Sequence, residues 1–145
     1  RSIDNPPVGN VKPPVQNNTS GKNLDLSNKG LTKVPSYVFD MTDLVALNLS
    51  GNSLEGALQS EVGRLKNLRT LDLSNNKFTG VPAEIGSLTN LETLNLSNNK
   101  ITGLPYEFGN LSKLKLLDVS GNNYAEADLA KIKASLPVNT VIKTK

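Results

Sequence analysis

The amino-acid sequence predicts an α/β solenoid: a curved parallel β-sheet on the concave side, short helical or irregular segments on the convex side, and a C-terminal cap of one helix and one strand. The first observation is a leucine pattern that occurs five times in a chain of 145 residues. The second is its period, because equivalent positions recur at intervals of 23, 24, 23 and 23 residues: Leu26, Leu49, Leu73, Leu96 and Val119. A fixed period of this size is the sequence signature of stacked supersecondary units.

The copy that shows the pattern most clearly has its apolar side chains at Leu91, Leu94, Leu96 and Ile101. Its Leu-x-Leu alternation predicts a short strand, in which both leucines point into the core and the residue between them points outward. Strands of successive copies then pair in parallel, which requires a crossover connection between them.

The second half of each copy supplies this crossover, most clearly in segments 81–88 and 104–111. Proline opens a helical turn well because it needs no amide donor there, and glycine can end one in a left-handed conformation. We therefore expect a helical turn in which proline is the first residue, one apolar side chain enters the core, and a left-handed glycine is the last residue. These residues are Pro82, Ile85 and Gly86 in one copy and Pro105, Phe108 and Gly109 in the next. The second copy has one extra residue within 55–58, which we place as a small bulge on the outer side.

One asparagine per copy stands where the chain leaves the strand and backbone groups lose their partners. An unpaired buried polar group costs roughly 1–3 kcal/mol, and an asparagine side chain can both donate to and accept from the adjacent backbone. We therefore expect a structural asparagine ladder, in preference to a ligand site, at Asn52, Asn76, Asn99 and Asn122.

These five copies in register resemble the leucine-rich repeat family over residues 21–124, with 23–24-residue repeats of the bacterial-like or plant-like type. The first copy lacks a leucine at Gly21 and has Lys29 in place of the asparagine, as terminal repeats often depart from the pattern. The chain lacks the cysteine-bearing caps of secreted plant and animal members, which favours a bacterial-like protein over a eukaryotic receptor ectodomain. The resemblance implies protein or peptide binding, usually through the concave sheet.

The head of the chain, residues 1–20, holds four prolines and four asparagines but no aromatic residue. This composition cannot bury enough apolar surface to offset its ordering entropy, so it predicts a disordered linker. The alternative is a cap, in which Val8, Val11 and Val15 lie across the open start of the core.

The last segment, residues 125–145, breaks the repeat pattern and predicts the C-terminal cap. Leu129, Ile132 and Leu136 fall at helical spacing, acids come early and lysines late, and Pro137 ends the helix. A final strand is expected over 138–142. Such a cap covers the core of the last repeat, so we expect a monomer.

The composition excludes several classes of function. There is no cysteine and no histidine, which removes the thiolate ligand, the usual zinc ligand and the usual general base. We therefore expect no enzyme, no catalytic residue, no metal and no cofactor. The net charge of +3 is too small for a nucleic-acid footprint, and no apolar run is long enough to insert into a membrane. The proline-rich head and the first residue, Arg1 in place of methionine, favour an extracytoplasmic location, secreted or surface-anchored.

The outward residues of the strands form the candidate site. In the column between the paired leucines, acids alternate with amides from strand to strand. This alternation either keeps the surface soluble without repulsion between like charges, or it recognises a partner that carries basic or amide groups. Acids on alternate strands lie about 9–10 Å apart, too far to share a metal ion. The set expected on the concave face is Asp25, Asn48, Thr70, Asp72, Thr93, Asn95, Leu116 and Asp118.

These residues include no tryptophan, tyrosine or arginine, which are the types that dominate binding hot spots, so we expect weak, electrostatic binding. An alternative site is the basic group formed in the turns by Arg64, Lys66, Arg69, Lys113 and Lys115. The functional hypothesis is a non-catalytic module that binds a protein or peptide. The alternative is a structural or surface-display spacer on a proline-rich stalk.

Overall fold

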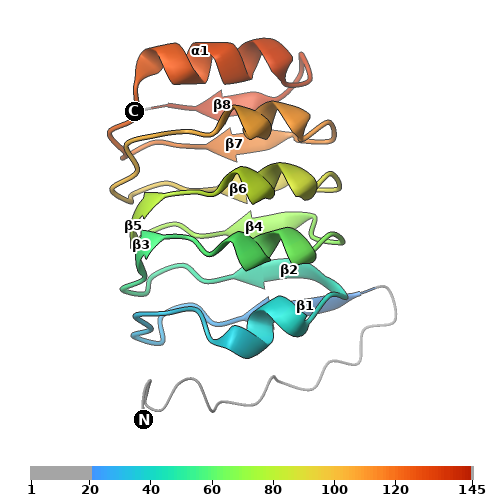
Figure 1. The fold of residues 1–145 in the computed structure, drawn as a ribbon, viewed down its shortest axis with the longest axis vertical. Coiled ribbons are helices and arrows are strands. Elements are labelled where there is room, and N and C mark those ends of the chain that lie inside the picture. The colour runs from blue at the N-terminus through green and yellow to red at the C-terminus, as the bar shows by residue number, and fades with distance from the viewer. Residues whose placement is uncertain (1–20, 145) are drawn as a thin grey trace.

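The computed structural model describes residues 21–144, which form a single stack of repeats. In Figure 1 the strands lie one above another along the long axis, the helical segments form a second layer, and α1 (Glu126–Ser135) lies at the C-terminal end. The sheet is parallel throughout, and in spatial order its strands are β1 (Lys22–Asp25), β2 (Leu44–Asn48), β4 (Thr70–Asp72), β6 (Thr93–Asn95), β7 (Leu116–Asp118) and β8 (Val141–Lys143). The predicted solenoid is confirmed. Both interpretations of residues 1–20 lie outside the described residues.

The repeats stack in register, so each sequence position forms a column across the sheet. Leu71 pairs with Leu94, and Leu94 pairs with Leu117, with the residues on either side aligned in the same way. The sheet therefore has one face directed at the helical layer and one directed away from it. We call the second one the concave face.

The crossovers contain short 3₁₀ helices, one in each of the first four repeats. Each begins directly after the position that proline occupies in three of them, and each sends an apolar side chain inward. The four are η2 (Ser36–Asp40), η3 (Ser60–Arg64), η4 (Ala83–Ser87) and η5 (Tyr106–Asn110).

The expected role of Gly86 and Gly109 is wrong. Both lie inside their 3₁₀ helices, and neither has a positive φ. A Cβ on Gly86 would lie 2.7 Å from the backbone oxygen of Glu107, and one on Gly109 would lie 2.6 Å from Cβ of Ser135. Glycine is needed there because the helical turns of neighbouring repeats stack too closely for a side chain.

One column of left-handed residues stands one position before the ladder asparagines, or before Lys29 in the first repeat. Their φ angles lie between 55° and 70°, a region in which asparagine and glycine cost least. Two of the repeats have glycine here, Gly51 and Gly121, and a Cβ on either would press against the side-chain oxygen of the asparagine in the preceding repeat. This column is Asn28, Gly51, Asn75, Asn98 and Gly121.

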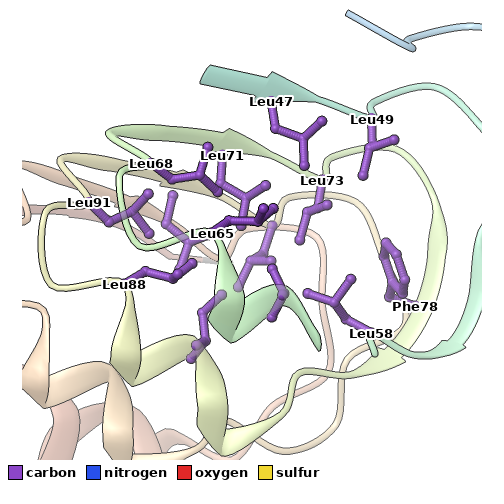
Figure 2. Packing of buried hydrophobic residues seen from close by; sticks show 14 of the residues in the cluster. Leu47, Leu49, Leu58, Leu65, Leu68, Leu71, Leu73, Phe78, Leu88 and Leu91 are labelled. Carbon is purple, nitrogen blue, oxygen red and sulfur yellow. The ribbon is translucent and has the colours of Figure 1, made fainter. Parts of the chain in front are cut away.

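Leucines of successive repeats fill the space between the sheet and the helical layer (Figure 2). Leu71 and Leu73 enter the core from the sheet side, Leu65 and Leu68 enter it from the crossover, and all four are fully buried. Each buried leucine side chain contributes about 1.5–3 kcal/mol relative to an exposed one. The core is therefore one continuous column along the solenoid.

A second, two-stranded sheet joins repeats two and three where β3 (Glu55–Ala57) pairs in parallel with β5 (Lys77–Gly80). The register shifts between Gly56 and Ala57, and Gly56 has a φ of +72°. The extra residue of repeat two is therefore accommodated as a local irregularity in this small sheet.

The C-terminal segment folds as the predicted helix–strand cap. Leu129, Ile132 and Leu136 are buried against the last repeat. The strand was predicted to begin at Val138, but β8 begins at Val141, and Val138 is 97% exposed. The reason is a turn, in which the Thr140 N–H donates to the Pro137 carbonyl at 3.0 Å.

Candidate functional site

The last residues of β1, β2, β4, β6 and β7 form one polar row on the concave face. Asp72 pairs in register with Asn48 on one side and with Asn95 on the other. Asp25 and Asp118 extend the row toward its two ends. Within this row Asp25 is exposed and the other four are half-buried, so the row is accessible from solvent.

Each side chain of this row is held by the serine two residues later. Asp72 Oδ1 accepts the Ser74 N–H at 3.0 Å and its hydroxyl at 2.7 Å, and Asn95 Oδ1 does the same with Ser97. The same pair of bonds joins Asp25 to Ser27, Asn48 to Ser50 and Asp118 to Ser120. The row is therefore a series of five Asx turns, and each turn is closed by two hydrogen bonds from the same serine.

The sequence analysis missed these serines and gave them no role. The signal was present, because Asx-x-Ser recurs at the same place in all five repeats. A residue of this type, two positions after an aspartate or asparagine, is the usual partner of an Asx turn.

The serine bonds also decide which atom of each side chain faces outward. Because Oδ1 is the atom that accepts from serine, Asn48 and Asn95 direct their Nδ2 donors away from the turn, and each aspartate keeps its Oδ2 acceptor. Within residues 21–144 the structure gives these outward atoms no hydrogen bond. The row therefore presents acceptors and donors in alternation, one per strand.

The pKa of Asp25 lies below its ordinary value because the Ser27 side chain, followed by the Ser27 backbone, donates hydrogen bonds to its carboxylate. Hydrogen bonds to the ionised form favour that form. The Asp25 end of the row therefore carries a negative charge at neutral pH.

The remaining predicted residues lie beside this row on the same face. Thr70, Thr93 and Leu116 are register neighbours across β4, β6 and β7. Thr70 is exposed, whereas Thr93 and Leu116 are half-buried. The structure thus places all eight predicted contact residues on one surface, and none of them is a large aromatic anchor.

The four ladder asparagines lie on the inner side of the turns and bond only to backbone. Asn76 Nδ2 donates to the carbonyls of Leu49 and Leu73 at 2.9 and 3.2 Å, and its Oδ1 accepts the Leu54 N–H at 3.1 Å. Asn52, Asn99 and Asn122 make equivalent bonds between their own repeat and the preceding one. These side chains use their donors and acceptors within the fold, which leaves none for a ligand.

The alternative basic group is not a single charged patch. Arg64 lies 3.5 Å from Asp40, Lys115 lies 3.4 Å from Glu92, and Lys113 donates to Asn90 at 2.8 Å. These exposed contacts offset part of the positive charge. The concave row therefore offers the more ordered surface.

Among residues 21–144 no three carboxylates gather closely enough to hold a metal ion. No helix of that range is long and apolar enough to cross a membrane.

A stack of strand-and-turn units with one ordered polar face defines a repeat protein that presents a long surface. The family described as "Leucine rich repeat" matches residues 22–78 and again residues 66–123. The chain therefore belongs to the leucine-rich repeat family. No curated protein matches the chain.

Solved structures of similar proteins come from a bacterium and from plants. A leucine-rich repeat protein of Leptospira interrogans is 38% identical, with a TM-score of 0.71, over 77% of this chain and 28% of that one. The plant peptide hormone receptor RGFR1, solved in complex with RGF2, is 32% identical, with a TM-score of 0.64, over 77% of this chain and 18% of that one. The ectodomain of the receptor kinase SOBIR1 from Arabidopsis thaliana is 28% identical, with a TM-score of 0.65, over 83% and 72%.

The chain thus spans less than a third of the length of the first two of these proteins. Their shared feature with this chain is the repeat fold.

Proposed function

We propose that the protein is a non-catalytic interaction module that binds a protein or peptide through its concave face. The observation that carries the proposal is the alternating row of outward acceptors and donors, which the serine bonds hold in fixed orientation. A preorganised polar surface loses little side-chain entropy when a partner binds. The peptide complex of the similar plant receptor supports the same use of the fold.

The partner carries cations or amide groups that match the row. Three carboxylates alternate with two amides at the strand spacing of about 4.8 Å, which suits a segment that runs across the strands. Binding is weak and depends on salt, because the row lacks aromatic and arginine anchors and exposed charges are screened. The protein works in an extracytoplasmic setting, which the ectodomain relative supports. It works as a monomer, because the C-terminal cap covers the end of the core.

The experiment compares two double variants in the capture of partners from a native extract, followed by binding measurements on the captured protein. Asp72→Asn with Asp118→Asn removes two charges but keeps the Oδ1 acceptor that serine uses, as Asn48 and Asn95 already do. Glu55→Gln with Glu107→Gln is the matched control, because it removes the same two charges from exposed acids off the concave face. We expect the first variant to melt like the parent and to lose binding, and the control to keep it.

A second function has an observation in its favour. Every polar residue of the row is already engaged by its own serine, so the row also satisfies turns in a structural or surface-display spacer. A spacer domain would capture no partner, and the polar row would then serve only to stabilise the turns of the fold. Partner binding that is equal in the parent and in the aspartate-to-asparagine variant would refute the concave-face proposal.

A further inference from the structure

Among the described residues 21–144, β8 is the last strand of the large sheet, and one of its edges has no neighbouring strand. The Val141 N–H donates to the Lys115 carbonyl at 2.8 Å, and the Lys143 carbonyl accepts the Val119 N–H at 3.0 Å, so these two residues face β7. Because backbone groups alternate in direction along a strand, the N–H and C=O of Ile142 face the other way. Within residues 21–144 they have no hydrogen-bond partner.

A groove runs along this free edge, between β8 and α1. Figure 1 shows α1 beyond β8 at the end of the solenoid. The groove has a volume of about 260 Å³ and is lined by Glu126, Leu129, Ala130, Lys133, Ile142 and Thr144. Its floor is apolar and its rim is charged.

Ile142 occupies the core-facing position of β8 but is only half-buried, whereas its register neighbour Leu117 is fully buried. The difference arises because Leu117 has strands on both sides and Ile142 has one. One more strand beside β8 would complete the layer and cover Ile142 from the side that the cap leaves open.

Apolar exposure and positive charge coincide at this edge. Val141 is 56% exposed and Val138 is 97% exposed, and these are two of the three exposed large apolar side chains in the described range. Lys143 extends the concave row beside Asp118, and Lys133 lies on the groove rim. The groove rim also carries Glu126, so its charge is balanced, and the positive charge that an incoming acidic strand would meet is that of Lys143 on the outward side.

We propose that β8 is a β-augmentation site for an extended acidic segment of a partner protein. One residue of that segment exchanges hydrogen bonds with the N–H and C=O of Ile142, and its apolar side chain enters the groove against Leu129 and Ala130. The neighbouring residues point outward, where acids lie beside Lys143. Backbone bonds supply affinity in such addition, and side-chain pockets supply specificity.

The occupant is a partner segment and not a second copy of the chain. Short edge strands that carry lysine discourage pairing between identical sheets, and β8 has both features. This surface lies at the end of the solenoid and meets the concave row only at its last strand, where Lys143 pairs in register with Asp118.

The test uses the full chain and a capped synthetic peptide of alternating valine and glutamate. We expect saturable binding, seen by NMR titration, with the largest shifts at β8 and α1 and slowed amide exchange at Ile142. The same peptide with N-methyl groups on the valines, and a peptide of alternating valine and lysine, should bind at least about tenfold more weakly, because one loses backbone donors and the other reverses the charge.

Protein variants give an independent readout. Ile142→Pro removes the outward N–H while it spares the bonds to β7, and Ile142→Val is its matched control. Lys143→Glu reverses the edge charge, and Lys77→Glu, an exposed lysine of β5, is its control. Binding that falls in Ile142→Pro and Lys143→Glu but not in the controls supports the proposal.

Three outcomes would overturn it: absence of binding, shifts confined to the concave face, or equal binding of the N-methylated peptide. Growth of dimers with protein concentration, with protection at Ile142 in the absence of peptide, would also overturn it and would assign the edge to a second copy.

Discussion

The carboxylate of Asp72 accepts both the backbone N–H and the hydroxyl of Ser74, at 3.0 and 2.7 Å. The same pair of bonds occurs in all five repeats. The side chains of the concave row therefore stabilise turns and also present atoms to solvent. A substitution there can disturb the turn, the surface or both. The predictions below separate these effects.

The hydroxyl of Ser74 should stabilise the fold. Ser74→Ala removes one charge-assisted bond from a buried position, and we expect a loss of about 1.5–3 kcal/mol in the free energy of unfolding, measured by urea denaturation. Ser112→Ala is the control, because Ser112 is exposed and follows η5 outside any Asx turn. Equal losses in the two variants would show that the doubly closed turn contributes nothing specific.

The asparagine ladder should be far more sensitive than its surroundings. Asn76→Ala and Asn99→Ala each leave several buried backbone groups unpaired, at roughly 1–3 kcal/mol per group. Asn123→Ala changes an exposed side chain just beyond the ladder. We expect the first two to lower the denaturation midpoint strongly and the third to leave it nearly unchanged. A similar midpoint for all three would contradict the ladder.

Alanine substitutions at Gly86 and Gly103 should change stability differently, because only Gly86 lacks space for a Cβ. Gly86→Ala places a Cβ 2.7 Å from the Glu107 carbonyl oxygen, and we expect a loss of about 1–3 kcal/mol from overpacking. Gly103→Ala meets nothing within 4 Å, and its φ is not in the left-handed region. That variant should be neutral or more stable by up to about 1 kcal/mol. Thermal melting of the pair checks the contrast, and a destabilised Gly103→Ala would argue against it.

Protonation of Asp25 should contribute to the loss of folding stability at acidic pH. Its pKa in the folded protein is lower than the ordinary 3.8, because Ser27 donates to the ionised carboxylate. A lowered folded pKa gives stability that is fully present above the unfolded pKa and is lost as the pH falls through the folded pKa. NMR titration of the carboxyl should therefore show a midpoint below 3.8, which Ser27→Ala raises. A midpoint that Ser27→Ala leaves unchanged would remove the serine as the cause.

Removal of the cap, residues 126–145, should convert the protein into a self-associating form. Leu129, Ile132 and Leu136 cover the last repeat, and their loss exposes a leucine stripe and the edge of β7. Light scattering of the truncated chain should show oligomers or precipitation where the full chain shows a monomer. A monomeric truncated chain would mean that the cap is dispensable for solubility.

The sequence by itself determined the stack, its register and the face on which each repeated position lies. A strict period with Leu-x-Leu in every copy leaves one way to bury the leucines, so Leu71, Leu94 and Leu117 had to align. The same logic placed Asp72 and Asn95 side by side on the concave face, and it placed the C-terminal helix over the last repeat.

Only the tertiary structure decided what depends on distances between neighbouring units. The sequence pattern predicted Gly86 as the residue that ends a helical turn. Glycine is instead required at this position because the backbone carbonyl of Glu107 in the next repeat lies too close for a Cβ, and no local pattern reveals this contact. The half-buried state of Ile142 depends on the number of strands beside it and on where α1 lies. Local periodicity determines which side of the chain faces the core, whereas close approach and free edges arise only when the repeats are stacked.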